Sequence, residues 1–384
     1  MFTNPFLIYI AAFVAVLGAY KLGWSSVYPA LSLPLLGFFA GTFLVAGSLA
    51  YAFQSTTAQI REHRPALPGW IIIPLVPMML ADIVCNGGVP LMMIANGHFN
   101  YARDLELVPH LHVLTVTFGS AFSTIRFADF LSTKRPRYLL EAALPVIYFV
   151  AIVYRGPAAI TLVSWGFVYL IAKRPRWPAL TALAMIAIAG LYLFGLFGNY
   201  RMQSNEHLLE RAGASPAFMK SGIPTTFFWA YVYFTSPMAN LELAVDTHKP
   251  APGAPAEFAV SELVPDIVSK RVLPLIGVAS RVSTPEAARG LNVATMFGRP
   301  FILMGWAGMA IMFAVFAAFV TAYLYLIRAS SLAIPALALL NTFVVFSTFQ
   351  NMIAYSGVFL QLVWPLLLMP LLDLPGALKK AQSE

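Results

Sequence analysis

Apolar runs of about 20 residues recur along most of this 384-residue chain, and they constrain its fold more than any other feature. Each run can cross the roughly 30 Å hydrocarbon core of a bilayer as an α-helix. Only 10% of the residues are charged, against about 25% in soluble domains. The sequence therefore predicts an all-α polytopic membrane protein with about ten spans, near 5–21, 28–53, 69–95, 108–130, 138–154, 156–173, 178–198, 297–327, 330–350 and 354–373.

Lysine and arginine residues are distributed unevenly between the two sets of connections. Eleven lie in one set and three in the other, the first being Arg61, Arg64, Lys134, Arg135, Arg137, Lys173, Arg174, Arg176, Arg328, Lys379 and Lys380 and the second Lys21, Arg103 and Arg155. Cytoplasmic connections carry the excess of positive charge. We therefore expect both termini inside and residues 199–296 outside. Since topology accounts for most of the net charge of +8, a nucleic-acid partner is excluded.

Three regions follow from this arrangement. Residues 1–198 form an N-terminal bundle of about seven spans, residues 199–296 a long periplasmic loop with interfacial helices, and residues 297–384 a C-terminal bundle of about three spans with a cytoplasmic tail. The apolar stretch 225–245 is interrupted at Ser236-Pro237 and is rich in Trp and Tyr. Such a stretch favours an interfacial or re-entrant helix. If it crossed the membrane instead, the last three spans would invert.

Arginine residues are concentrated in the outer segment, where the topology rule does not require them. Arg201 directly follows a span and Arg299 directly precedes one. Single arginines at such positions often anchor a helix at the interface. A planar guanidinium also binds phosphate through two parallel hydrogen bonds. We interpret Arg201 and Arg299, followed by Arg281 and Arg289, as candidates for binding a pyrophosphate.

Several groups of the outer segment have the chemistry of proton acceptors. Glu242 and Asp246 are spaced i, i+4 and share a helical face, and His248 follows closely. These three are the candidate catalytic residues, although such a pair is also typical of a solvated surface helix. The sequence contains no HExxH or calcium-loop motif, so we expect chemistry without a metal or other cofactor. Residues 283–286 (STPE) predict a helix start, with the helix continuing to about Leu291.

Asp82 lies in the middle of the third predicted span. An ionisable residue there costs several kcal/mol unless it is partnered. Asp82 either forms an ion pair with an arginine of the outer segment, or has no partner and is neutral. A proton relay would need a second ionisable residue near Asp82, and no second acid in mid-membrane is evident. Arg126 and Asp129, nearer the cytoplasmic end of the fourth span, are expected to form a structural pair.

Three motifs of the outer segment together resemble the Wzy-type oligosaccharide repeat unit (O-antigen) polymerases of bacterial inner membranes. They are residues 198–201 (GNYR), 229–240 (WAYVYFTSPMAN) and 291–300 (LNVATMFGRP). The resemblance covers about residues 195–360, and one departure from the family pattern is Val293-Ala294-Thr295 after Asn292. It implies a helical bundle of the GT-C glycosyltransferase type in the bacterial inner membrane, with the active site facing the periplasm.

The reaction implied by this resemblance joins undecaprenyl-pyrophosphate-linked oligosaccharides. The growing glycan is transferred from its lipid pyrophosphate onto a hydroxyl of a lipid-linked repeat unit. The bilayer, a chain-length regulator and a flippase of the same pathway are the further partners implied. The motifs supply the candidate glycan-binding residues, which are Asn199, Trp229, Tyr231, Tyr233, Asn240, Asn292 and Thr295. The aromatic members either stack on sugars or form the interfacial belt.

Two other functions remain open. An O-antigen ligase would move a finished glycan onto a lipid acceptor, and would use similar groups. A transporter or flippase for an anionic lipid-linked substrate would need a path of partnered polar groups through the bundle. Beyond Asp82, the apolar spans offer few such groups.

Overall fold

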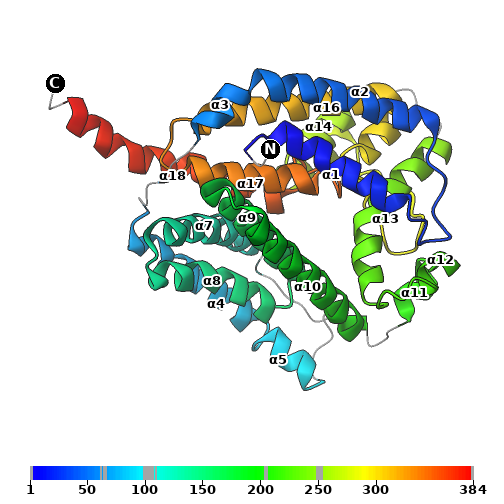
Figure 1. The fold of residues 1–384 in the computed structure, drawn as a ribbon, viewed down its shortest axis with the longest axis horizontal. Helices are drawn as coiled ribbons and strands as arrows, with labels where there is room; N and C mark the ends of the chain where they lie inside the picture. The colour runs from blue at the N-terminus through cyan, green and yellow to red at the C-terminus, as the bar shows by residue number, and fades with distance from the viewer. Residues whose placement is uncertain are drawn as a thin grey trace.

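The computed structural model describes residues 3–60, 63, 67–97, 108, 110–202, 206–247 and 254–381. Apart from an isolated bridge between Ser25 and Ala214, these residues form helices and loops (Figure 1). The elements are α1 Pro5–Tyr20, α2 Leu33–Ala52, α3 Gln54–Gln59, η1 Gly69–Ile72, α4 Leu75–Cys85, α5 Pro90–Ala95, α7 Leu111–Thr133, α8 Pro136–Ala151, α9 Arg155–Lys173, α10 Trp177–Met202, α11 His207–Arg211, α12 Pro216–Met219, α13 Phe227–Thr247, α14 Pro255–Leu263, α15 Asp266–Val272, η2 Leu273–Ile276, α16 Gly298–Ile327, α17 Ala333–Phe346 and α18 Ser356–Ala381.

The all-helical prediction is confirmed, and a helix lies at each of the ten predicted span positions. Within the described residues, five segments are long and apolar enough to cross a bilayer, namely Leu33–Ala52, Gly69–Ala95, Arg155–Lys173, Trp177–Tyr200 and Gly298–Ile327. Three shorter apolar helices accompany them at Pro5–Tyr20, Ala333–Phe346 and Ser356–Pro370. α7 is 23 residues long but less apolar, because it carries many buried Ser and Thr side chains.

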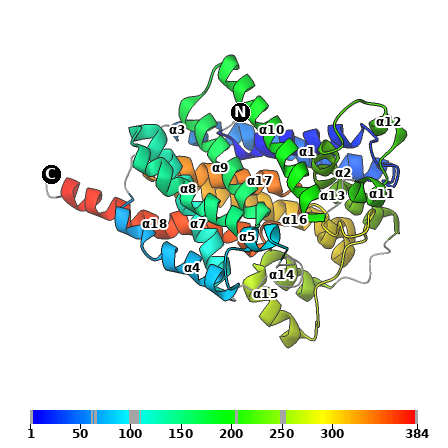
Figure 2. The same ribbon diagram turned by 90° about the horizontal axis from the view of Figure 1, so that it is seen from below.

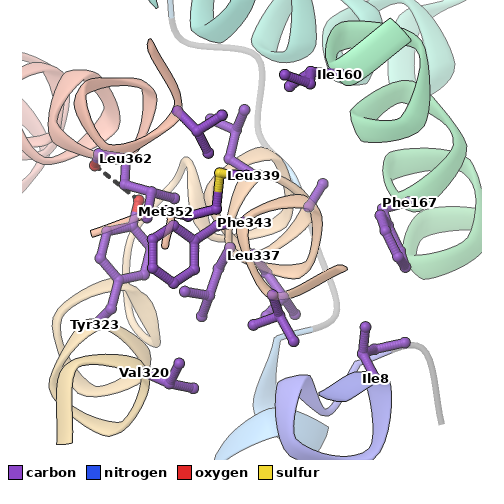
Figure 3. Close-up of a cluster of buried hydrophobic side chains, with 14 of the residues drawn as sticks. Ile8, Ile160, Phe167, Val320, Tyr323, Leu337, Leu339, Phe343, Met352 and Leu362 are labelled. Atoms are coloured by element: carbon purple, nitrogen blue, oxygen red, sulfur yellow. Dashed lines mark hydrogen bonds between the residues drawn. The ribbon is translucent and has the colours of Figure 1, made fainter. Parts of the chain in front are cut away.

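α7 and α17 form the centre of the bundle. Nearly every side chain of α17 is buried, and α7 packs against α4, α8, α9, α17 and α18. Figure 3 shows the apolar part of this centre, where Phe343 of α17 lies near Tyr323 of α16. The Tyr323 hydroxyl donates a 3.0 Å hydrogen bond to the carbonyl of Leu362, which joins α16 to α18. This hydrogen bond and the close packing around it fix the C-terminal part of α16 against α18.

Buried polar contacts also tie the helices together. The predicted pair of Arg126 and Asp129 forms, at 2.9 Å, and both side chains are fully buried. Arg126 Nε is 2.7 Å from Glu141, and His63 Nε2 is 2.7 Å from Asp129. Buried charges are stable when each has such partners. This network is a structural connection between α7, α8 and the segment before η1.

α13 is one continuous helix through Pro237, although the sequence suggested an interruption there. It packs against α1, α10 and α16, and most of its side chains are buried. Two glycines of α10 permit the close approach of α13. A Cβ atom on Gly195 would lie 2.1 Å from the Thr226 carbonyl oxygen, and one on Gly198 would lie 2.6 Å from the Trp229 ring. The 225–245 stretch, expected to form an interfacial or re-entrant helix, thus forms one helix that packs within the bundle.

α16 is broken near its N-terminal end. Gly305 has φ of 61° and ψ of −148°, so the element consists of helical pieces at 298–304 and 306–327. Glycine adopts such a conformation without the steric cost that other residues incur. A Cβ atom on Gly308 would lie 2.1 Å from the Pro300 carbonyl oxygen, which shows how closely the chain folds back. Figure 2 shows α14 and α15 at the side of the bundle, where α14 packs against α16.

Candidate functional site

A polar cavity of about 240 Å³ lies beside α14 and α15, at the N-terminal end of α16. Three stretches of the chain build it: 262–270, 281–299 and 350–355. Its lining is rich in charged and amide side chains, in contrast to the apolar helices. The lining residues are Glu262, Asp266, Lys270, Arg281, Thr284, Asn292, Val293, Ala294, Thr295, Arg299, Gln350, Asn351, Ala354 and Tyr355.

Two of the four predicted pyrophosphate-binding residues, Arg281 and Arg299, converge on this cavity, and both are half-buried. One terminal nitrogen of Arg281 donates to the Ser269 hydroxyl. Its Nε is buried and has no hydrogen-bond partner among the described residues. Burial lowers the pKa of Arg281, and the positive charge of Arg299 lowers it further, while Glu262 and Asp266 oppose both effects. An anion in the cavity would relieve this repulsion and supply the missing acceptor.

Glu262 supplies negative charge beside the two arginines. Its side chain is fully buried at the end of α14. One carboxylate oxygen accepts from the Ser261 hydroxyl at 3.1 Å, and the other accepts from Asn351 Nδ2 at 3.0 Å. Burial raises the pKa of Glu262, and Asn351, Arg299 and Arg281 offset part of the rise. Glu262 therefore supplies buried negative charge on the cavity wall, close enough to both arginines for their charges to affect its pKa.

This raised pKa predicts a pH-dependent stability. The unfolded carboxyl titrates near 4.5, and the folded one titrates higher. The folded state therefore binds more protons between these two values, so its free energy of unfolding falls as pH rises through that window. For a single group the fall is at most about 1.4 kcal/mol per pH unit. We expect Glu262→Gln to remove this component in denaturant unfolding measured across pH. Glu257→Gln, on the same helix, is the control, and an unchanged profile in Glu262→Gln would contradict the assignment.

Asp266 and Lys270 form the rim of the cavity. Lys270 Nζ is 3.0 Å from an Asp266 carboxylate oxygen, and the lysine side chain is 69% exposed. The other oxygen of Asp266 accepts from the Ser356 backbone N–H at 3.0 Å. Burial raises the pKa of Asp266, but the hydrogen bonds from Ser356 and the contact with Lys270 outweigh burial and leave it lowered. Asp266 is consequently a weak base, and the exposed Lys270 adds positive charge at the rim.

The wall that carries Arg299 is held by Asn240, a predicted glycan-binding residue. Asn240 is fully buried on α13. Its Nδ2 donates to the Leu291 and Val293 carbonyls, the latter at 2.7 Å, and its Oδ1 accepts from Ala287 N–H at 2.8 Å. Through these bonds the Asn240 side chain, on α13, binds the backbone of residues 287–293. The helix predicted to start at residue 283 is therefore wrong, since this stretch is irregular and is held by tertiary hydrogen bonds.

The other members of the third motif lie on the cavity wall. Asn292 is exposed and lines the cavity, and its carbonyl accepts from the Thr284 hydroxyl at 2.6 Å. Thr295 also lines the cavity but is 1% exposed. Its hydroxyl accepts from Phe297 N–H at 3.2 Å, immediately before α16 begins. Of the two side chains, Asn292 is thus the one that a ligand can reach.

The remaining candidate residues lie elsewhere. Arg289 is exposed and does not line the cavity. Arg201 lies in the last turn of α10, and its side chain is outside the described residues, as is all of His248. Glu242 is fully buried and accepts from Ser32 N–H at 2.9 Å, at the start of α2. Burial raises the pKa of Glu242, whereas Asp246 is exposed, and neither residue lines the cavity.

The aromatic candidates take part in packing. Trp229 and Tyr231 are 6% and 5% exposed. Trp229 Nε1 donates to Asn199 Oδ1 at 2.5 Å, which joins α13 to α10. Tyr233 is half-buried, and its hydroxyl accepts a 2.8 Å hydrogen bond from Arg155, whose guanidinium also lies over the Trp229 ring. Asn199 and the three aromatics thus form an interface between helices, away from the cavity.

Sequence reasoning missed Glu262, Asn351 and Tyr355, which complete the cavity. The 350–355 stretch follows the predicted span 330–350 and carries no charged residue to mark it. In the part of the chain that the structure describes, no group of three or more His, Cys, Asp or Glu residues is arranged to hold a metal ion.

Comparisons with protein-family models, with curated proteins and with solved structures find no match to this chain. The cavity and the three sequence motifs are therefore the features that indicate a function. The fold and the cavity together define a helical protein with apolar helices of membrane-spanning length and a compact, positively charged site at one end of the bundle.

Proposed function

We propose that this protein is a glycosyltransferase that joins glycans carried on lipid diphosphates, and specifically a polymerase of oligosaccharide repeat units of the O-antigen type. The observation that supports it most is the pair of half-buried arginines on one cavity, with a buried Arg281 Nε that no described residue satisfies. Diphosphate offers the charge and the acceptor oxygens that such a pair binds. The resemblance of 291–300 to the polymerase family places the same arginine, Arg299, in a family motif.

In the proposed reaction, an acceptor hydroxyl attacks the anomeric carbon of the donor glycan, and undecaprenyl pyrophosphate leaves. Charge accumulates on the leaving diphosphate as the bond breaks. Arg281, Arg299 and Lys270 neutralise that charge in a partly dehydrated site, where fixed cations stabilise a transition state most strongly. Glu262 supplies compensating negative charge beside the two guanidinium groups. Asn292 contributes an exposed amide for a sugar hydroxyl.

We further propose how the helices and the cavity are placed in the membrane. About ten spans in a bundle of the GT-C type would put the cavity at the periplasmic face of the bacterial inner membrane. Grooves between the apolar helices would hold the prenyl tails of donor and acceptor. A chain-length regulator and a flippase of the same pathway are the proposed protein partners.

A purified-protein assay tests the proposal. The full-length protein is incubated with one defined lipid-linked oligosaccharide, and product masses are read over time. We expect a ladder that increases by one repeat unit at each step. A product that forms only when a lipid A–core acceptor is added would instead identify a ligase. Transport of the lipid-linked oligosaccharide across liposomes without any new glycosidic bond would contradict both transferase assignments.

A further inference from the structure

Asp82, the acid in the middle of a predicted span, has partners inside the bundle. It is fully buried on α4, and it accepts hydrogen bonds from the Tyr148 hydroxyl at 2.5 Å and from Val108 N–H at 3.2 Å. His112 Nδ1 lies 2.8 Å from the oxygen that Tyr148 contacts. The expected pairing of Asp82 with an outer-segment arginine is therefore wrong, and these contacts account for the buried carboxylate without a ligand.

A second cavity, of about 660 Å³, has no such explanation within the bundle. It is lined by the beginning of α1, the C-terminal part of α2, α3 and the C-terminal end of α9. Small-molecule sites usually have volumes of about 300–1,000 Å³. The second cavity is thus large enough for a ligand, and it shares no residue with the cavity that contains Arg281 and Arg299.

Most of the length of α16 separates the two cavities. The first lies at the N-terminal end of α16, whereas Phe53, directly before α3, packs against Tyr325 near the C-terminal end with ring centroids 5.7 Å apart. The helical piece 306–327 between them is about 30 Å long, which is close to the thickness of the hydrocarbon core. Figure 2 shows α3 and α15 on opposite sides of the bundle. In a bilayer, the two cavities would therefore open at opposite faces.

The second cavity carries positive charge that nothing in its lining balances. Arg174 is the charged residue of the lining, and Lys173 and Arg176 lie beside it in the chain, all three of them exposed. In the described parts of the chain, no side chain forms an ion pair or hydrogen bond with the Arg174 guanidinium. The backbone positions this residue instead, since Arg174 N–H donates to the Leu170 carbonyl at 3.2 Å at the end of α9. An anion in the cavity would meet an unpaired guanidinium.

The rest of the wall suits an amphiphilic molecule. Tyr51 and Gln54 contribute exposed polar groups, and Leu7 and Leu170 contribute apolar surface. Trp177, the first residue of α10, directly follows the basic stretch and is 82% exposed. Tryptophan is enriched where the headgroups of a bilayer meet its hydrocarbon core. The second cavity thus combines a cation, hydrogen-bonding groups and apolar surface at the depth of a lipid headgroup.

We propose that the second cavity binds the headgroup of an anionic phospholipid, with the phosphate on Arg174 and the glycerol and upper acyl chains on the apolar wall. Basic pockets between membrane helices on the cytoplasmic side recognise such headgroups, and the cytoplasmic leaflet supplies anionic lipids. The distribution of Lys and Arg independently places residues 173–176 on the cytoplasmic side. This site is separate from the proposed glycosyl transfer, because it uses none of the residues of the first cavity.

The test titrates the full-length protein in detergent with dioleoyl phosphatidylglycerol or with phosphatidylcholine of the same chains, and native mass spectrometry counts the bound lipid. We expect wild type to prefer phosphatidylglycerol. Arg174→Ala should lower the affinity for phosphatidylglycerol about fivefold, the effect of one cation near a membrane surface, and change that for phosphatidylcholine less. Arg135→Ala is the matched control, because Arg135 is an exposed arginine on another predicted cytoplasmic connection and does not line the cavity. It should bind both lipids as wild type does.

Gly47→Leu tests the space in the cavity separately from its charge. Gly47 lies on α2 in the cavity wall, and an added Cβ atom would have no neighbour within 4 Å, so a leucine can occupy the cavity while α2 keeps its conformation. We expect the affinity for phosphatidylglycerol to fall at least as far as in Arg174→Ala, with an unchanged Tm. Gly41→Leu is the control, since Gly41 has equally open surroundings on the same helix but lies outside the cavity.

Three results would overturn the lipid site. Equal affinity of wild type for the two lipids would remove the role of headgroup charge. A loss in Arg135→Ala as large as that in Arg174→Ala, or unchanged affinity in both Arg174→Ala and Gly47→Leu, would place the lipid elsewhere on the surface. Complete displacement of phosphatidylglycerol by inorganic phosphate would identify free phosphate as the ligand. A wild type that forms no glycosidic bond would reject the proposed function alone, because lipid binding is measured without any glycan.

Discussion

Arg299→Ala and Arg281→Ala are each expected to lower the rate of glycan transfer by about 100- to 1000-fold, which is the usual cost of removing one fixed group that stabilises transition-state charge. Arg281 and Arg299 line the same cavity. Each variant therefore lacks a guanidinium group that would face the proposed leaving group. The fold should survive, since both residues are only half-buried and Glu262 retains its bonds to Ser261 and Asn351. The measurement is the single-turnover rate with a defined lipid-linked donor and acceptor.

Arg289→Ala is the matched control for these two variants. Arg289 lies in the same segment and is exposed, but it does not line the cavity. We expect it to reduce the rate less than threefold. Arg299→Lys adds a second comparison, because lysine keeps the positive charge but cannot form the two parallel hydrogen bonds of a guanidinium. If Arg289→Ala is as inactive as Arg299→Ala, the effect arises from the charge of the whole outer segment and the cavity assignment is wrong.

Asn240→Ala is expected to destabilise the protein by about 3 kcal/mol or more. The change leaves two carbonyl groups and one N–H group of 287–293 without their partner, and each unsatisfied buried group costs about 1–3 kcal/mol. The affected stretch leads directly into the cavity wall and Arg299. We therefore expect weaker pyrophosphate binding in the same variant, measured by calorimetry beside unfolding in denaturant.

Asn96→Ala provides the comparison for Asn240→Ala. Asn96 is an exposed asparagine at the end of α5, far from residues 287–293 in the chain. Its replacement should change the free energy of unfolding by less than about 0.5 kcal/mol, as for most surface substitutions. Equal stability of the two variants would show that the bonds of Asn240 do not hold the cavity wall.

Much of the helical organisation could be predicted from hydropathy, because apolar length alone determines where a chain can form a membrane helix. The first span was expected at 5–21 and α1 covers Pro5–Tyr20. Interruptions were harder to predict. The 69–95 segment is divided into η1, α4 and α5, and α16 is broken at Gly305, where tertiary packing exploits glycine. Conversely, α13 continues through Pro237 because its neighbours bury it.

The candidate site was only partly predictable, for a related reason. Charge in the outer segment identified Arg281 and Arg299, since cations outside the topology rule are conspicuous in a sequence. Asn240 and Trp229 occur in the motifs that carried the resemblance, yet both take part in packing: Asn240 binds a backbone stretch and Trp229 binds Asn199. Glu262 could not be predicted, because its importance comes from Asn351, 89 residues away in the chain. Sequence spacing does not report such tertiary contacts.

The most direct measurement is an experimental structure of the full-length protein with undecaprenyl pyrophosphate bound in a lipid nanodisc. The account predicts diphosphate density inside the cavity, within hydrogen-bond distance of the Arg281 and Arg299 guanidinium groups, with the prenyl tail leading toward the apolar helices. Diphosphate bound at the other end of the bundle, or a cavity that remains without it at saturating ligand, would contradict the account.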